Sequence, residues 1–145
     1  MSAMPATRVG DEVSVGDTLP ELVLDITPTL IVSGAIASRD FQEVHHDRDL
    51  AQERGSRDIF MNILTSNGLV GRYVTDWAGP DAVLQRVSIR LGAPNYPGDQ
   101  MTLTGHIVAK EDHADAATVT VELRGENGLG DHVVGTVDLL LPRSG

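Results

Sequence analysis

Residues 60–79, FMNILTSNGLVGRYVTDWAG, carry the strongest helical pattern in the chain, and Pro80 follows them. Its apolar residues are spaced by three, four and seven positions, as expected for one face of an α-helix. They are Phe60, Ile63, Leu64, Val70, Tyr73, Val74 and Trp77. Gly79 suits a helix C-terminus, and Pro80 cannot continue a helix. The pattern therefore predicts one long buried helix over residues 60–79.

Extended segments are predicted on both sides of this helix. Residues 22–24 (LVL) precede it, and four segments with strand-like alternation follow Pro80, at 82–91, 100–110, 117–123 and 132–141. Residues 125–128 (GENG) are a turn signal between the last two. This order predicts an α+β fold in which an antiparallel meander wraps round one central helix. Residues 1–145 are expected to form a single domain, with 1–12 flexible.

Two further segments have weaker patterns. The apolar run at residues 30–37 is compatible with either a strand or a helix. Residues 47–53 are predicted to form a short helix that Asp47 caps and Gly55 ends.

Composition excludes several classes of function. A formal charge of −10 argues against nucleic-acid binding, and no apolar run approaches the roughly 20 residues that cross a bilayer. The 145-residue chain has no cysteine and no secretion signal, which favours a reducing cytoplasm. An anionic ligand would need a local basic patch or one from a partner. The candidates are Arg72, Arg86 and Arg90, although ordinary surface charges are the simpler interpretation.

The polar stretch at residues 39–51, RDFQEVHHDRDLA, carries the candidate chemistry. Asp40 precedes His45 by five residues, so a carboxylate and an imidazole can hold one water molecule and exchange its proton. The ordinary histidine pKa of about 6.5 suits proton transfer near neutral pH. A solvated, helix-capping loop explains the spacing equally well. A metal site is rejected, because the adjacent His45 and His46 diverge and the other histidines are scattered.

Residues 40–51 resemble the signature of MaoC-like and R-specific enoyl-CoA hydratases, roughly Gly-Asp-x-Asn-Pro-Leu-His-x-Asp-Pro-x-x-Ala. The matching positions are Asp40, Val44, His45, Asp47 and Ala51, whereas Arg39, Gln42 and Glu43 depart from the pattern. The segments 39–49, 58–65, 72–80, 90–92 and 129–133 are similar to one branch, the small MaoC-like subunit of a bacterial steroid side-chain hydratase. This resemblance covers most of the chain from about Leu19 onward.

The resemblance implies a hotdog fold and hydration of a trans-2-enoyl-CoA thioester with a steroid side-chain acyl group. Asp40 and His45 would be the catalytic acid–base pair. The donors to the thioester oxygen are expected at Asn62 and Ile63, where generic hydratases have His-Gly at 61–62. Either backbone N–H groups or the Asn62 amide would serve there, and a simple N-cap is the alternative reading. His46 is expected to be a solvent-facing or structural neighbour.

The resemblance also implies a second MaoC-like subunit in a heterodimer or heterotetramer. That partner would supply much of the CoA and acyl pocket and could dock a lipid-transfer-protein-like aldolase. No cofactor is expected, because CoA is part of the substrate.

Two other functions remain open at this stage. A hotdog acyl-CoA thioesterase usually places a carboxylate on the central helix, but here no Asp or Glu occurs after Asn62 until Asp76. A non-catalytic structural subunit would have no need of both Asp40 and His45.

Overall fold

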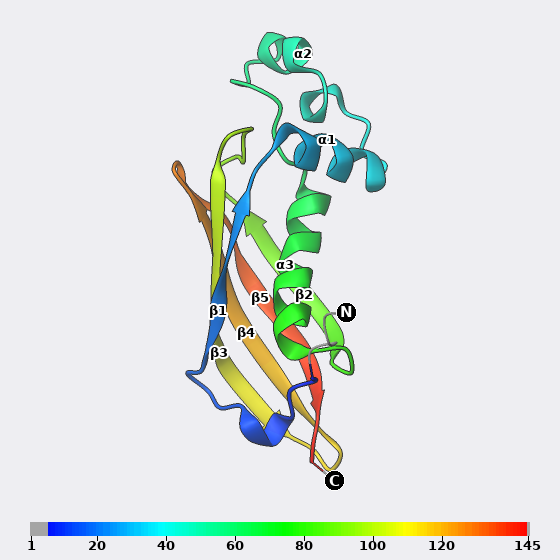
Figure 1. The fold of residues 1–145 in the computed structure, drawn as a ribbon, viewed down its shortest axis with the longest axis vertical. Coiled ribbons are helices and arrows are strands. Elements are labelled where there is room, and N and C mark those ends of the chain that lie inside the picture. Colours follow the sequence, from blue (N-terminus) through cyan, green and yellow to red (C-terminus); the bar gives the residue numbers. More distant parts are fainter. Residues whose placement is uncertain (1–5, 145) are drawn as a thin grey trace.

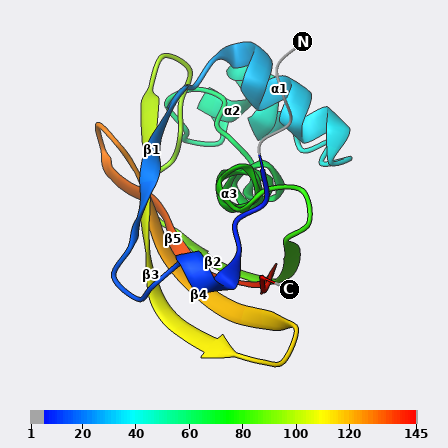
Figure 2. The same cartoon turned by 60° about the horizontal axis from the view of Figure 1, so that its bottom comes forward.

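The computed structural model describes residues 6–144, which form one antiparallel sheet folded round a long helix (Figure 1). The strands are β1 (Thr18–Asp25), β2 (Val83–Leu91), β3 (Gln100–Asp112), β4 (Ala116–Asn127) and β5 (Gly130–Pro142). The helices are α1 (Pro28–Ala37), α2 (Arg48–Glu53) and α3 (Ile63–Ala78), with short 3₁₀ turns at Gly10–Glu12 and Glu43–His45. Seen along α3, the sheet curves round one side of this helix (Figure 2).

The central helix is confirmed, but it begins three residues later than predicted. Asn62 is its N-cap, and the Asn62 side chain accepts a hydrogen bond from the Thr65 N–H. Phe60 and Met61 precede the cap and belong to the irregular segment that leads into it. Gly79 ends the helix at φ 94°, a backbone conformation that favours glycine over other residues.

The sheet order is β1-β3-β4-β5-β2. Strands β3, β4 and β5 form the predicted meander, and the β4–β5 turn is residues 128–129, slightly later than expected. The prediction that β2 continues this meander is wrong, because β2 pairs with β5 at the far edge and leaves β1 beside β3. The β2–β3 connection therefore carries the chain across the sheet, past β5 and β4. This arrangement makes β1 and β2 the edge strands.

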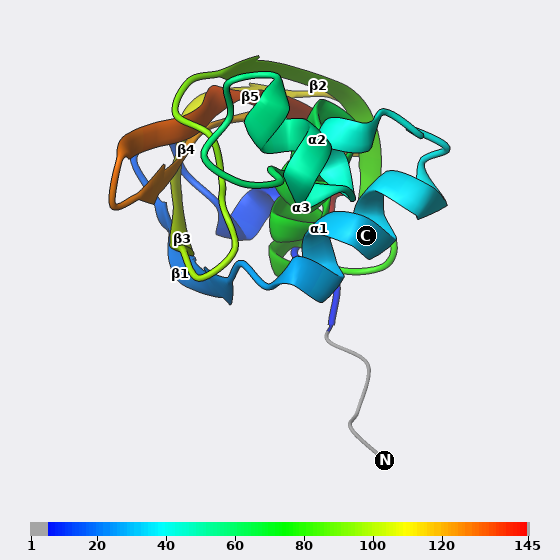
Figure 3. The ribbon, with the colours of Figure 1, turned by 90° about the horizontal axis from the view of Figure 1, so that it is seen from above.

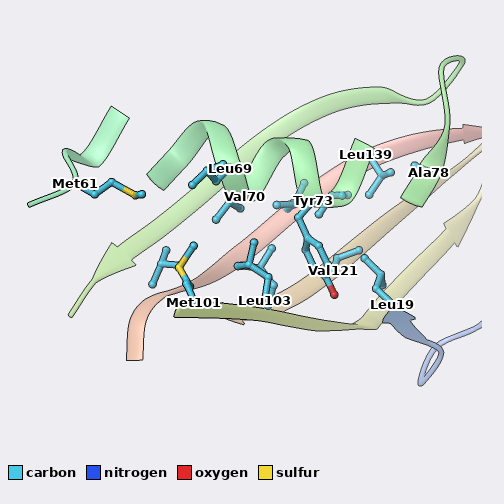
Figure 4. Packing of buried hydrophobic residues seen from close by; sticks show 14 of the residues in the cluster. Leu19, Met61, Leu69, Val70, Tyr73, Ala78, Met101, Leu103, Val121 and Leu139 are labelled. Atoms are coloured by element: carbon cyan, nitrogen blue, oxygen red, sulfur yellow. The ribbon is translucent and has the colours of Figure 1, made fainter. Parts of the chain in front are cut away.

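The core lies between α3 and the concave face of the sheet (Figure 4). Val70 and Tyr73 of α3 face Met101 and Leu103 of β3, and all four are nearly inaccessible to solvent. Burying each such side chain stabilises the fold by roughly 1.5–3 kcal/mol. Tyr73 also donates its hydroxyl to the Pro20 carbonyl across 2.9 Å, which joins α3 to the edge strand β1.

Two short helices cover one end of this structure, above the N-terminus of α3 (Figure 3). The ambiguous run at residues 30–37 is helical, since Thr27 caps α1 and Pro28 occupies its first turn. The prediction for the second short helix is confirmed: Asp47 Oδ1 accepts from the Leu50 N–H at 3.1 Å, and Gly55 follows at φ 93°. Between α1 and α2 lies the polar stretch that carries the candidate chemistry.

The N-terminal stretch expected to be flexible is described only from residue 6, since residues 1–5 lie outside the described part. Within the rest, Gly10–Glu12 form a 3₁₀ turn and Arg8 lies over the Trp77 ring at 5.1 Å. Over the described chain, every helix falls short of the length and apolar character that crossing a membrane requires.

Candidate active site

A cavity of about 450 Å³ lies at the N-terminal end of α3. Four segments that are distant in the sequence line it, and its polar side chains include Asp40, Gln42, His45, Asn62, Tyr96 and His132. Three larger hollows, of about 610, 600 and 560 Å³, lie on the sheet strands, on α1 and beside the C-terminal half of α3. None of them contains Asp40 or His45, so the smaller cavity is the candidate active site.

The structure brings Asp40 and His45 together. Asp40 Oδ2 lies 3.3 Å from His45 Nε2, and the two side chains are 20% and 9% exposed. The other ring nitrogen, Nδ1, lies 2.7 Å from the Phe60 carbonyl oxygen. A carbonyl can only accept, so Nδ1 carries the hydrogen and Nε2 of the neutral ring offers a lone pair. The Phe60 ring meets the imidazole edge-on at 5.0 Å and fixes its plane further.

The backbone just after α1 sets the position of Asp40. Ser38 ends the helix, and Arg39 adopts φ 59°, a left-handed conformation that is uncommon outside glycine. The Asp40 N–H then donates to the Ala35 carbonyl at 2.9 Å, which closes the helix end. This reversal directs the Asp40 side chain towards His45, which lies on the 3₁₀ turn Glu43–His45.

Both residues expected to stabilise the thioester oxygen line the same cavity. Asn62 is 1% exposed and precedes Ile63, the first residue of α3. The Asn62 side-chain amide does not point freely into the cavity, because Nδ2 donates to Asp40 Oδ2 at 3.1 Å. Backbone N–H groups at the start of a helix have no acceptor within it. The backbone of these two residues is therefore the available source of donors.

His132 also lines the cavity, although no sequence pattern predicted a role for it. It lies on β5, is 2% exposed, and its Nδ1 donates to the Ala93 carbonyl at 2.7 Å. Its Nε2 accepts from the Ser66 hydroxyl of α3, also at 2.7 Å. Burial lowers the pKa of His132, and the Ala93 hydrogen bond opposes this shift. The segment 129–133 belonged to the family resemblance, which was the one signal available for this residue.

The lowered pKa of His132 makes the folded protein sensitive to acid. The unfolded chain gains a proton on this residue below about pH 6.5, whereas the folded chain resists it. The contribution of His132 to the free energy of unfolding is therefore fully present above pH 6.5 and is lost as the pH falls towards the folded-state pKa. The free energy of unfolding then decreases by at most about 1.4 kcal/mol per pH unit. Urea unfolding at pH 7.5, 6.5 and 5.5 measures this loss. His132→Asn should lose less stability over the same range; an equal loss would contradict the assignment.

The remaining candidates lie elsewhere. His46 is exposed, as expected, and its Nε2 lies 3.3 Å from the Phe41 carbonyl. Arg72 pairs with Asp76 at 3.3 Å, and neither Arg86 nor Arg90 on β2 lines the cavity. Within residues 6–144, no three His, Asp or Glu side chains gather closely enough to hold a metal ion.

Comparison with known proteins connects this geometry to a family. The model of the MaoC like domain matches residues 12–127. The 3-oxo-4,17-pregnadiene-20-carboxyl-CoA hydratase beta subunit of Mycobacterium tuberculosis is 55% identical over 125 residues, which are 86% of this chain and 94% of that protein.

Solved structures agree with this match. A chain in the crystal structure of the ChsH1–ChsH2 complex from Mycobacterium tuberculosis is 54% identical with a TM-score of 0.84, over 88% of this chain and 98% of that one. The unliganded R-hydratase PhaJ1 from Pseudomonas aeruginosa reaches the same TM-score at 20% identity, over 94% and 86% of the two chains. This second likeness concerns the fold, and it confirms the prediction of a hotdog fold.

Proposed function

Because the chain belongs to the MaoC-like domain family and is a homologue of a hydratase beta subunit, we propose that it is the catalytic subunit of a heteromeric enoyl-CoA hydratase. The reaction adds water to a trans-2-enoyl-CoA thioester and yields the 3-hydroxyacyl-CoA. The observation that carries the proposal is the 3.3 Å approach of Asp40 Oδ2 to His45 Nε2 on the wall of one cavity.

The pair supplies the acid–base chemistry. Nδ1 of His45 is committed to the Phe60 carbonyl, so the Nε2 lone pair accepts a proton from water held between Nε2 and the Asp40 carboxylate. The oxygen of that water attacks the electrophilic Cβ of the enoyl group, and the C=C electrons move towards the thioester oxygen. A proton delivered by the pair to Cα then completes the addition.

The start of α3 supplies the electrostatic stabilisation. Negative charge develops on the thioester oxygen as water attacks, and fixed N–H donors stabilise charge at that point. The Asn62 and Ile63 backbone lines the cavity beside the acid–base pair, and the helix dipole adds positive potential there. We assign these backbone N–H groups as the oxyanion donors.

The similar proteins and the lining of the cavity support a substrate and a partner. The homologous beta subunit belongs to a hydratase of a steroid side-chain thioester, and a similar chain occurs in a complex of two proteins. Phe60, Met61 and Leu91 give the cavity an apolar wall that suits a hydrocarbon acyl group. We therefore propose a steroid side-chain enoyl-CoA as substrate and a second MaoC-like subunit as partner, through which an aldolase could dock.

A hotdog thioesterase usually places a carboxylate on the central helix, and no carboxylate of α3 lines this cavity. Ser66 is hydrogen-bonded to His132, and Thr65 is hydrogen-bonded to Asn62. Asp76, the first carboxylate on the helix, is exposed near its other end and pairs with Arg72. This arrangement favours hydration over thioester cleavage.

The test uses the chain co-expressed with its neighbouring genes and purified as the assembled complex, with native mass measurement to establish the partner. The enoyl-CoA is then followed by two readouts, loss of the conjugated-enoyl absorbance and release of free thiol. We expect loss of absorbance without thiol release. Thiol release would instead identify a thioesterase, and an inactive complex would exclude catalysis by this pair. A fully active homodimer would overturn the heteromeric part alone.

A further inference from the structure

The structure assigns a second task to Asn62: we infer that its side-chain amide is a positioning group that holds the Asp40 carboxylate for catalysis. This inference rests on the proposed hydratase function and deepens it. Asn62 is both the N-cap of α3 and a neighbour of Asp40, so one side chain connects the central helix to the catalytic loop.

The amide has all its hydrogen-bonding groups in use. Its oxygen, Oδ1, accepts from both the N–H and the hydroxyl of Thr65. Its nitrogen, Nδ2, donates one hydrogen to Ser38 Oγ at 2.9 Å and the other to Asp40 Oδ2 at 3.1 Å. A side chain that is 1% exposed and fully hydrogen-bonded has one orientation.

The end of α1 determines which way round the amide lies. The Ser38 hydroxyl donates to the Gly34 carbonyl at 2.7 Å and is also 3.2 Å from the Ala35 carbonyl. A carbonyl only accepts, so the Ser38 oxygen must itself accept from Asn62. This places the NH₂ group, and not the oxygen, against the Asp40 carboxylate.

Capping alone does not require asparagine. Serine and aspartate cap helices about as well, because an N-cap uses only the side-chain oxygen. The NH₂ group adds a neutral donor to Asp40 Oδ2, the same oxygen that faces His45 Nε2. The neutral His45 ring cannot donate from Nε2, and the Gln42 N–H donates to the other oxygen, Oδ1, at 3.4 Å. Asn62 is therefore the side chain that donates to Oδ2 and holds the carboxylate plane. A hydrogen bond donated to a carboxylate favours its charged form over the neutral acid.

The test replaces Asn62 in the assembled complex and follows the pH profile of kcat/KM. Asn62→Asp retains the cap but places a second carboxylate against Asp40, and Asn62→Ser retains the cap but removes the donor. Loss of a hydrogen bond to a charged group should reduce kcat about ten- to hundredfold while KM changes little. The acidic limb of the profile should move to higher pH, further in Asn62→Asp than in Asn62→Ser.

Two features isolate this effect. The other titratable groups that line the cavity are His45, Tyr96 and His132, and all are unchanged in both variants. Asn67→Asp makes the same chemical change on an exposed position of α3 and should leave the profile where it is. An effect that came only from a new carboxylate opposing the oxyanion would appear in Asn62→Asp and not in Asn62→Ser, which introduces no charge.

The experiment distinguishes a failure of this inference from a failure of the proposed function. If the wild-type complex does not hydrate the enoyl-CoA, the proposed function is wrong. With an active wild type, an unmoved acidic limb in Asn62→Ser, together with a lowered melting temperature, would show that Asn62 is only a cap. If Asn62→Asp does not assemble, Asn62→Ser decides.

Discussion

Asp40→Asn is expected to lower the hydration rate of the assembled complex by about 10²- to 10⁴-fold, the range typical for loss of a general acid or base. Asparagine has the same shape, and its oxygen can still accept from Asn62 Nδ2, so the loop should keep its conformation. It cannot, however, accept or return a proton. The loss should therefore appear in kcat, with assembly and melting temperature close to those of the wild type.

His45→Ala completes this prediction with a loss of the same order. Removing the imidazole deletes the Nε2 lone pair that faces Asp40 and also the donor to the Phe60 carbonyl. His46→Ala is the matched control, because this adjacent imidazole is exposed and should leave the rate near that of the wild type. Absorbance of the conjugated enoyl-CoA measures all three. If Asp40→Asn and His45→Ala both hydrate at wild-type rates, the pair is structural.

The parts of the fold that local patterns encode were predictable. The spacing of apolar residues identified α3, and alternation identified β3 through Met101, Leu103 and Ile107, which are fully buried. The position of β2 in the sheet was not predictable, because strand pairing depends on contacts between segments far apart in the chain. Here β2 pairs with β5. The start of α3 was also misplaced, since Phe60 continues the apolar spacing although Asn62 caps the helix.

The candidate site, too, was only partly predictable from the sequence. A spacing of five residues shows that Asp40 and His45 can meet, but the meeting depends on the left-handed Arg39, which no residue pattern indicates. Ser38 and Asn62 are 24 residues apart in the sequence, and they meet only because α1 packs against α3. His132 reaches the cavity only because β5 lies beside the end of β2. Non-local contacts of this kind need the folded structure.

Among glycine-to-alanine substitutions in the sheet, Gly135→Ala is expected to lower the free energy of unfolding most. Gly135 on β5 lies opposite Ile89 on β2, and a Cβ there would overlap the Ser88 carbonyl oxygen and lie 3.0 Å from Ile89 Cα. Both neighbours are backbone atoms that cannot rotate away, so the two strands must separate. We expect a loss of about 2–3 kcal/mol in the free energy of unfolding, at the upper end for overpacking.

The same substitution should also reduce hydration, because β2 leads directly into one wall of the cavity. Leu91 ends the strand, and Gly92 donates its N–H to the His132 carbonyl at 2.8 Å, so a displaced β2 moves this wall relative to Asp40 and His45. Gly68→Ala is the control: a Cβ at Gly68 meets nothing within 4 Å, and alanine in a helix interior should stabilise by about 1 kcal/mol. Urea unfolding and the absorbance assay on the assembled complex measure both effects. Should Gly135→Ala unfold within about 0.5 kcal/mol of the wild type, a change typical of harmless surface substitutions, the close β2–β5 approach that shapes this wall would be wrong.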